Sequence, residues 1–75
     1  MPRQFVDESI FQGVKEFLTP RGRMYAESPF GDGTWKVYFR QGDGALKFEC
    51  VVNTGRGATP RDIYRKWLAA GGASV

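Results

Sequence analysis

The chain has no histidine and only one cysteine among its 75 residues. Without imidazole, the usual general base near neutral pH is missing, and so are histidine-bearing triads and zinc sites that need histidine. Cys50 lies in the apolar run 48–52, where a small buried hydrophobe is favoured over a reactive thiol. We therefore expect neither an enzyme nor a metal or other cofactor, and a lone cysteine is typical of a reducing, cytoplasmic compartment.

Long apolar segments are also absent. Asp7 and Glu8 stand where a signal peptide needs an apolar stretch, and no apolar run approaches the roughly 18 residues that span a bilayer. At 75 residues the chain is expected to form a single domain, 1–75, with flexible ends at 1–6 and 71–75. Such a domain has little room for an enclosed active site, so we expect a binding module with no membrane partner.

The apolar residues near the N-terminus recur with helical spacing. They are Ile10, Phe11, Val14, Phe17 and Leu18. A helix is predicted from Asp7 or Ser9 to Leu18, because either residue can cap its free amides. The following segment 19–22 contains a proline and a glycine and is expected to end it.

Three strands are predicted next, at 23–28, 34–41 and 45–53. Their connectors contain Asp-Gly at 32–33 and 43–44, which supplies the backbone angles that tight hairpins need. Alternation along the last two strands assigns one set of side chains to the core. The set comprises Trp35, Val37, Phe39, Leu46, Phe48, Cys50 and Val52.

A second helix is predicted after the loop 53–58. Thr59 is a suitable N-cap, Pro60 suits the first turn, and Asp62 is an acid at the third position. Its apolar stripe is Ile63, Tyr64, Trp67 and Leu68. Gly71 and Gly72 are expected to end the helix.

The expected fold is α+β, a two-layer sandwich of order αβββα in which two helices pack on a three-stranded antiparallel sheet. This element order resembles that of double-stranded-RNA-binding domains, and the arm-binding domain of tyrosine integrases shares the strands and the final helix. The resemblance is one of topology. The segments Pro60-Arg61-Asp62 and 29–33 stand where the RNA-binding family has its lysine cluster and a Gly-Pro-x-His turn.

Positive charge gathers after residue 20, where nine Lys and Arg face five Asp and Glu. The loop 53–58 and the second helix hold four cations that we predict to contact nucleic-acid phosphates. They are Arg56, Arg61, Arg65 and Lys66. A flexible glycine loop that leads into a helix N-terminus offers amides, a positive dipole end and guanidinium groups to a phosphate. The alternative is an ordinary connector with a solvated basic face, and the Gly-Lys-Ser/Thr ending of a P-loop is absent.

The polar face of the predicted sheet is a second candidate nucleic-acid surface, through Lys36, Tyr38 and Arg40. Its rings and cations alternate as on platforms that bind single strands. The full set is Arg23, Tyr25, Lys36, Tyr38, Arg40 and Lys47. The alternative is that these cations pair with Glu27 and Glu49 across neighbouring strands, with no ligand.

Phe30 and Phe5 lie outside the predicted stripes, so each either covers the core edge or anchors a partner protein. Asp32 and Asp43 occupy tips at opposite ends of one strand, roughly 20 Å apart, and cannot share a metal. The leading hypothesis is a small non-enzymatic module that contacts nucleic-acid phosphates. The alternative is a phage- or plasmid-type regulator that binds a host protein, such as the transcription machinery, and an acidic partner surface would suit the same cations.

Overall fold

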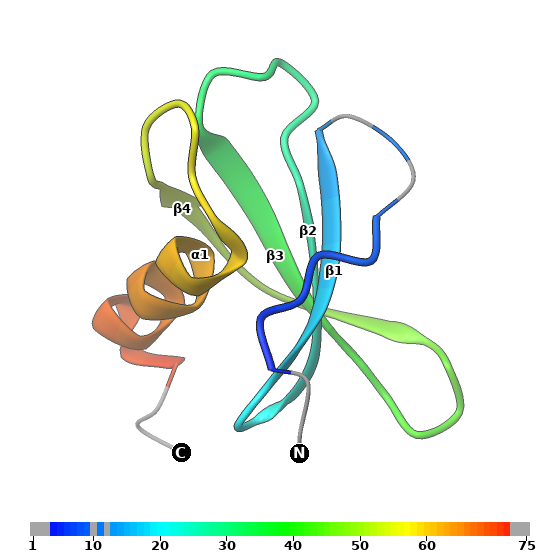
Figure 1. Ribbon diagram of the computed structural model, residues 1–75. Helices are drawn as coiled ribbons and strands as arrows, with labels where there is room; N and C mark the ends of the chain where they lie inside the picture. The colour runs from blue at the N-terminus through cyan, green and yellow to red at the C-terminus, as the bar shows by residue number, and fades with distance from the viewer. Residues whose placement is uncertain (1–3, 10, 12, 73–75) are drawn as a thin grey trace.

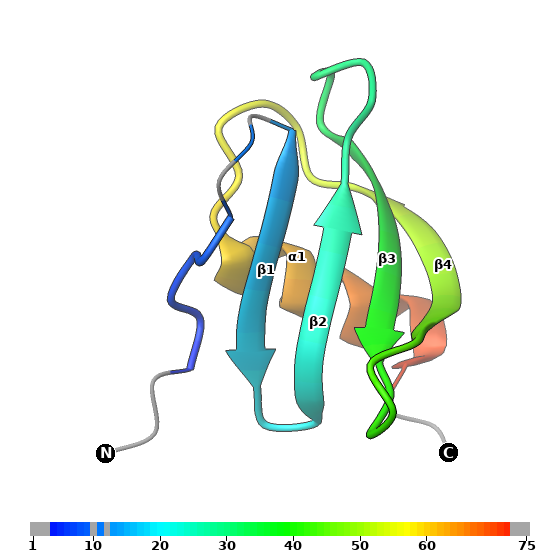
Figure 2. The same ribbon diagram turned by 90° about the vertical axis from the view of Figure 1, so that its right-hand side faces the viewer.

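The computed structural model describes residues 4–9, 11 and 13–72. Within them, four strands form one antiparallel sheet whose spatial order follows the chain. The strands are β1 (Val14–Thr19), β2 (Gly22–Glu27), β3 (Thr34–Arg40) and β4 (Leu46–Asn53). One helix, α1 (Pro60–Trp67), continues into a π-helical turn, η1 (Leu68–Gly72), and packs against one face of the sheet (Figures 1 and 2).

The predicted order αβββα is wrong, because β1 occupies the second half of the predicted first helix and the sheet has four strands. Gly13 precedes β1 with φ +77°, and a Cβ there would lie 2.9 Å from the Ser28 carbonyl oxygen. The segment expected to end a helix is instead a hairpin turn, in which Thr19 pairs with Gly22. Because the first helix is absent from the described residues, the topological resemblance to double-stranded-RNA-binding domains is lost.

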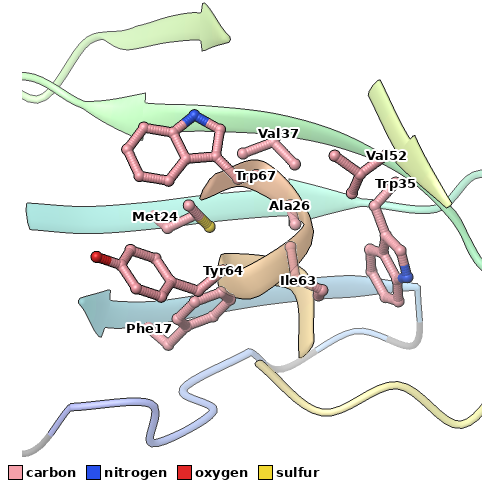
Figure 3. Close-up of a cluster of buried hydrophobic side chains, with 9 residues drawn as sticks. All are labelled: Phe17, Met24, Ala26, Trp35, Val37, Val52, Ile63, Tyr64 and Trp67. Carbon is pink, nitrogen blue, oxygen red and sulfur yellow. The ribbon is translucent and has the colours of Figure 1, made fainter. Parts of the chain in front are cut away.

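The core lies between α1 and the sheet (Figure 3). Phe17, Met24 and Ile63 are completely buried, which joins β1, β2 and α1 in one apolar cluster. The cluster comprises Phe17, Met24, Ala26, Trp35, Val37, Val52, Ile63, Tyr64 and Trp67. The predicted stripe of the second helix is therefore confirmed, since its three buried residues all contribute.

A β-bulge in the β3–β4 pair changes which side chains of β4 face the core. Val37 lies opposite Cys50, but the next residue, Tyr38, lies opposite Phe48, so Glu49 is the extra residue. Phe48 is 53% exposed on the face away from α1, which we call the open face. The predicted core positions of Leu46 and Phe48 are wrong for this reason, and Phe11, also predicted to be core, is 68% exposed.

The N-terminal segment runs beside β1. The amide of Phe5 donates to the Leu18 carbonyl (2.7 Å), and the amide of Glu8 donates to the Glu16 carbonyl (2.8 Å). Residues 4–6, predicted to be flexible, therefore include a backbone contact to the sheet. Residues 71–72 of the predicted flexible ends belong to η1. Residues 1–3 and 73–75 lie outside the described residues, as does Ile10 of the predicted first helix.

Candidate nucleic-acid interface

The loop between β4 and α1 carries the first of the four predicted phosphate-contacting cations. Gly55 and Gly57 both have φ +75°, which lets the chain turn on each side of Arg56. Arg56 is exposed, and among the described residues it forms no ion pair. Its guanidinium is therefore open to an external acceptor.

The N-terminus of α1 is closed by its own capping box. The Thr59 Oγ1 accepts from the Asp62 amide (3.3 Å), and the Asp62 carboxylate accepts from the Thr59 amide (2.9 Å). Hydrogen bonds donated to this carboxylate by the Thr59 amide and by the Thr59 hydroxyl (3.0 Å) lower the pKa of Asp62. A carboxylate thus occupies the end of the helix that would favour an anion, and the helix-dipole part of the phosphate hypothesis has no support from this geometry.

The three cations of α1 all lie on its exposed surface. The Arg61 guanidinium carbon lies 5.5 Å from the centre of the Phe5 ring, which orients this side chain through a cation–π contact. Arg65 and Lys66 border a shallow hollow of about 340 Å³ beside Thr54. No ion pair involves any of these three cations within the part of the chain that the structure describes.

The cations of the open face are placed differently. Arg40 donates to both carboxylate oxygens of Glu16, from Nε at 2.8 Å and Nη2 at 3.1 Å, and from Nη1 to the Gly44 carbonyl at 2.7 Å. Hydrogen bonding to Glu16 raises the pKa of Arg40. Arg23 is paired with Glu8. Two of the cations proposed for a sheet platform are thus held by carboxylates of the same chain.

Tyr38 and Lys36 complete the predicted sheet surface. The Tyr38 hydroxyl donates to Glu27 (3.1 Å), and desolvation, followed by this hydrogen bond, raises the pKa of Tyr38. Lys36 is exposed and lies opposite Val51 in the register, on the same face. Lys47 is opposite Phe39, which contacts Trp67 on the helix side, so Lys47 does not join the Tyr38 surface.

An aromatic row crosses the open face and was not predicted in full. The rings of Tyr25 and Tyr38 are 5.9 Å apart, and those of Tyr38 and Phe48 are 5.5 Å apart, both in edge-to-face geometry. Val51, also 53% exposed, extends the apolar surface. Sequence reasoning placed Phe48 in the core because the bulge that exposes it has no signature in the alternation of β4. Val51 was left out of the predicted core but was not named as part of a binding surface.

The two predicted protein-contacting residues differ in exposure. Phe30 is 87% exposed in the β2–β3 connector, whereas Phe5 is half-buried, with its ring 5.5 Å from that of Tyr64. Phe30 is therefore free to meet a partner, while Phe5 covers the edge of the core beneath Arg61.

The described part of the chain contains no group of three Cys, Asp or Glu side chains placed to hold a metal. Asp32 and Asp43 accept from the amides of Thr34 and Ala45, both at 3.0 Å, and so stabilise their own turns. Burial, followed by the charge of Glu49, raises the pKa of the Cys50 thiol, which disfavours the reactive thiolate.

A pocket lies at the end of the sheet where β1 begins and β2 ends, and the sequence analysis did not predict it. It has a volume of about 410 Å³, and its walls include Ser28, Trp35 and Arg56 with several glycines. The glycine-rich connectors are visible in the sequence, but their meeting depends on the sheet topology.

Comparison of the chain with protein-family models, curated proteins and solved structures finds no match. None of the helical segments described here has the length and apolar character needed to cross a membrane.

Proposed function

We propose that this protein is a small non-enzymatic module that binds nucleic acid through its phosphates, using Arg56, Arg61, Arg65 and Lys66. One observation carries the proposal: these four side chains, all from the β4–α1 loop and α1, are exposed and lack an ion-pair partner among the described residues, although Lys15, Arg23 and Arg40 all have one. Arg21, Lys36 and Lys47 are also exposed and unpaired within the described chain, but they lie on the strands and the β1–β2 turn, apart from this group. An unpaired cation has no internal bond to break before it meets a phosphate. Because the chain has a lone, free cysteine, we keep the cytoplasm as its proposed compartment.

The placement of the cations suits a flexible polyanion. Arg61 and Arg65 are neighbours on the helix surface, one turn apart, so they can contact phosphates close together on one strand. Thr54 borders the hollow beside Lys66, and Arg56 follows two residues later on the wall of the adjoining pocket. The basic surface therefore continues from α1 onto the loop.

The test is a fluorescence-anisotropy titration of labelled single-stranded DNA, single-stranded RNA and both duplexes, at 50 and 200 mM salt. Four phosphate contacts predict that log K falls with log salt with a slope of roughly −3. Arg21→Gln, which removes an exposed charge in the β1–β2 turn, is the matched control and should leave the slope unchanged. Absence of binding to all four nucleic acids, or binding that does not respond to salt, would overturn the proposal.

A second candidate function is docking on a partner protein, favoured by the exposure of Phe30. A large apolar ring at a connector tip forms an anchor that a partner pocket can bury. A photo-crosslinker at position 30 should then capture one protein from the native host, and competition with unlabelled wild type, but not with Phe30→Ser, should abolish the capture. Capture that the Phe30→Ser variant competes away equally well would exclude this role for Phe30.

A further inference from the structure

The pocket described above lies where three connectors come together. The segments before β1, between β2 and β3, and between β4 and α1 all lie at the same end of the sheet (Figures 1 and 2). The lining residues are Gly13, Ser28, Gly31, Gly33, Trp35, Gly55, Arg56 and Gly57. Its volume of about 410 Å³ falls in the range of sites that hold small organic groups.

Glycine makes the pocket possible at its tightest point. A Cβ on Gly33 would lie 2.5 Å from the carbonyl carbon of Gly55, so any larger residue would push the two connectors apart. A Cβ on Gly31 or Gly57 would meet no atom within 4 Å, so these two positions face open space. The β2–β3 and β4–α1 connectors thus lie in close contact at Gly33 and leave room beside it.

Ser28 lines this pocket and carries a hydroxyl that no other group among the described residues uses. Its backbone is occupied, because the amide donates to the Gly13 carbonyl (2.6 Å) and the carbonyl accepts from the Gly31 amide (3.1 Å). Its side-chain oxygen is buried and has no hydrogen-bond partner in the described structure. A buried hydroxyl without a partner costs free energy, so a ligand that supplies one would be bound more tightly.

Trp35 and Arg56 give the pocket two further properties. The Trp35 indole N–H donates to the Thr54 Oγ1 (3.0 Å), so the polar atom of the indole is satisfied. Trp35 belongs to the core cluster and is 7% exposed, so only an edge of this side chain is left for apolar contact in the pocket. The unpaired Arg56 supplies positive charge. An occupant therefore needs an apolar, hydrogen-bonding part together with an attached anion.

We propose that this pocket receives one unstacked base of a single-stranded nucleic acid, with the phosphate of that nucleotide bound by Arg56. A base combines an apolar ring with edge groups that both donate and accept, which suits the exposed edge of Trp35 and the Ser28 hydroxyl. An inorganic anion alone would lose hydration against the indole without using its surface. In a duplex the base edges are already paired. The inference rests on the proposed function and adds to it a preference for single strands.

The decisive comparison uses two probes with equal phosphate charge, a single-stranded DNA octamer and the same chain without bases. Wild type should bind the octamer roughly tenfold more tightly than the abasic chain. Ser28→Ala should reduce this preference by roughly three- to tenfold, which corresponds to the loss of one hydrogen bond. Binding of the abasic chain should not change. Equal affinity of wild type for both probes, or a preference that Ser28→Ala leaves intact, would overturn the inference.

A second measurement separates this pocket from the aromatic row of the open face. The indole N–H resonance of Trp35, assigned with Trp67→Phe, should shift with the octamer and not with the abasic chain. If neither probe binds, the proposed function fails, and titration with a nucleoside 5′-monophosphate then decides the pocket separately. A Trp35 shift that Arg56→Gln weakens and Arg21→Gln does not would support the pocket, and no shift would overturn it.

Discussion

The side of the molecule near β1 and the side formed by the loop and α1 use their polar groups in opposite ways. Near β1, Lys15 is paired with Asp7, Arg23 with Glu8, and Arg40 with Glu16. On the other side Arg56, Arg61, Arg65 and Lys66 are exposed and unpaired in the described structure. The same residue types thus hold the fold together on one side and remain available for a ligand on the other.

The largest effect should come from removing the unpaired cations. Combining Arg61→Gln, Arg65→Gln and Lys66→Gln should weaken single-strand binding roughly 10²-fold at 50 mM salt and make the salt slope shallower by about 2, because three phosphate contacts are lost. Fluorescence anisotropy measures both quantities.

The matched control neutralises the paired cations with Lys15→Gln, Arg23→Gln and Arg40→Gln. It removes the same charge but should lower the thermal midpoint and weaken binding far less. Equal losses of affinity in the two triple variants would show that net charge, rather than the placement of the cations, controls binding.

Replacing Ser28 with alanine should stabilise the protein. The hydroxyl is buried without a partner, so its removal should raise the free energy of unfolding by about 1 kcal/mol. Urea denaturation of Ser28→Ala beside the wild type measures the change. A loss of stability in Ser28→Ala would mean that the hydroxyl is satisfied in the folded state.

Breaking the ion pair between Glu16 and Arg40 should convert Arg40 from a paired cation into one that is available to a ligand. Glu16→Gln removes the carboxylate that binds Arg40, which should lower the thermal midpoint by roughly 2 to 5 °C. The freed Arg40 should slightly strengthen nucleic-acid binding. Weaker binding in this variant would contradict the division between paired and available cations.

The smallest effect concerns pH. Burial raises the pKa of Asp7, but hydrogen bonds from Lys15 and Ser9 outweigh it, and the net pKa lies below 3.8. Its stabilising contribution is therefore complete above about pH 4 and is lost as the pH falls through the lowered value. After solvent screening we expect a few tenths of a kcal/mol between pH 5 and pH 2, which Asp7→Asn should abolish in urea denaturation curves. An unchanged pH profile would rule out this contribution.

The later part of the fold followed from local signals. Thr59 and Asp62 form the predicted capping box, and α1 begins at Pro60 as expected. The three predicted strands correspond to β2, β3 and β4 within a residue or so at each end. Caps and Asp-Gly turns act over a few residues, which is why the sequence alone reveals them.

The prediction for the N-terminal residues was wrong because the spacing of their apolar side chains fits both the period of a helix and that of a strand. Phe17 and Leu18 complete a helical stripe with Val14, yet Phe17 and Thr19 also alternate as the buried side of a strand. The choice between helix and strand depends on hydrogen bonding to β2, and a short stretch of sequence carries no information about that pairing. The same limit applies to the candidate site: its cations could be named in advance, but whether each one has a carboxylate partner depends on the folded sheet.

The order of strands in the sheet has a kinetic consequence. Because β1, β2, β3 and β4 lie side by side in the order of synthesis, every pairing closes a short stretch of chain. Such short closures cost little entropy and favour rapid folding. Each hairpin can form as soon as its second strand leaves the ribosome, whereas the docking of α1, which is made after the sheet, must wait for all four strands.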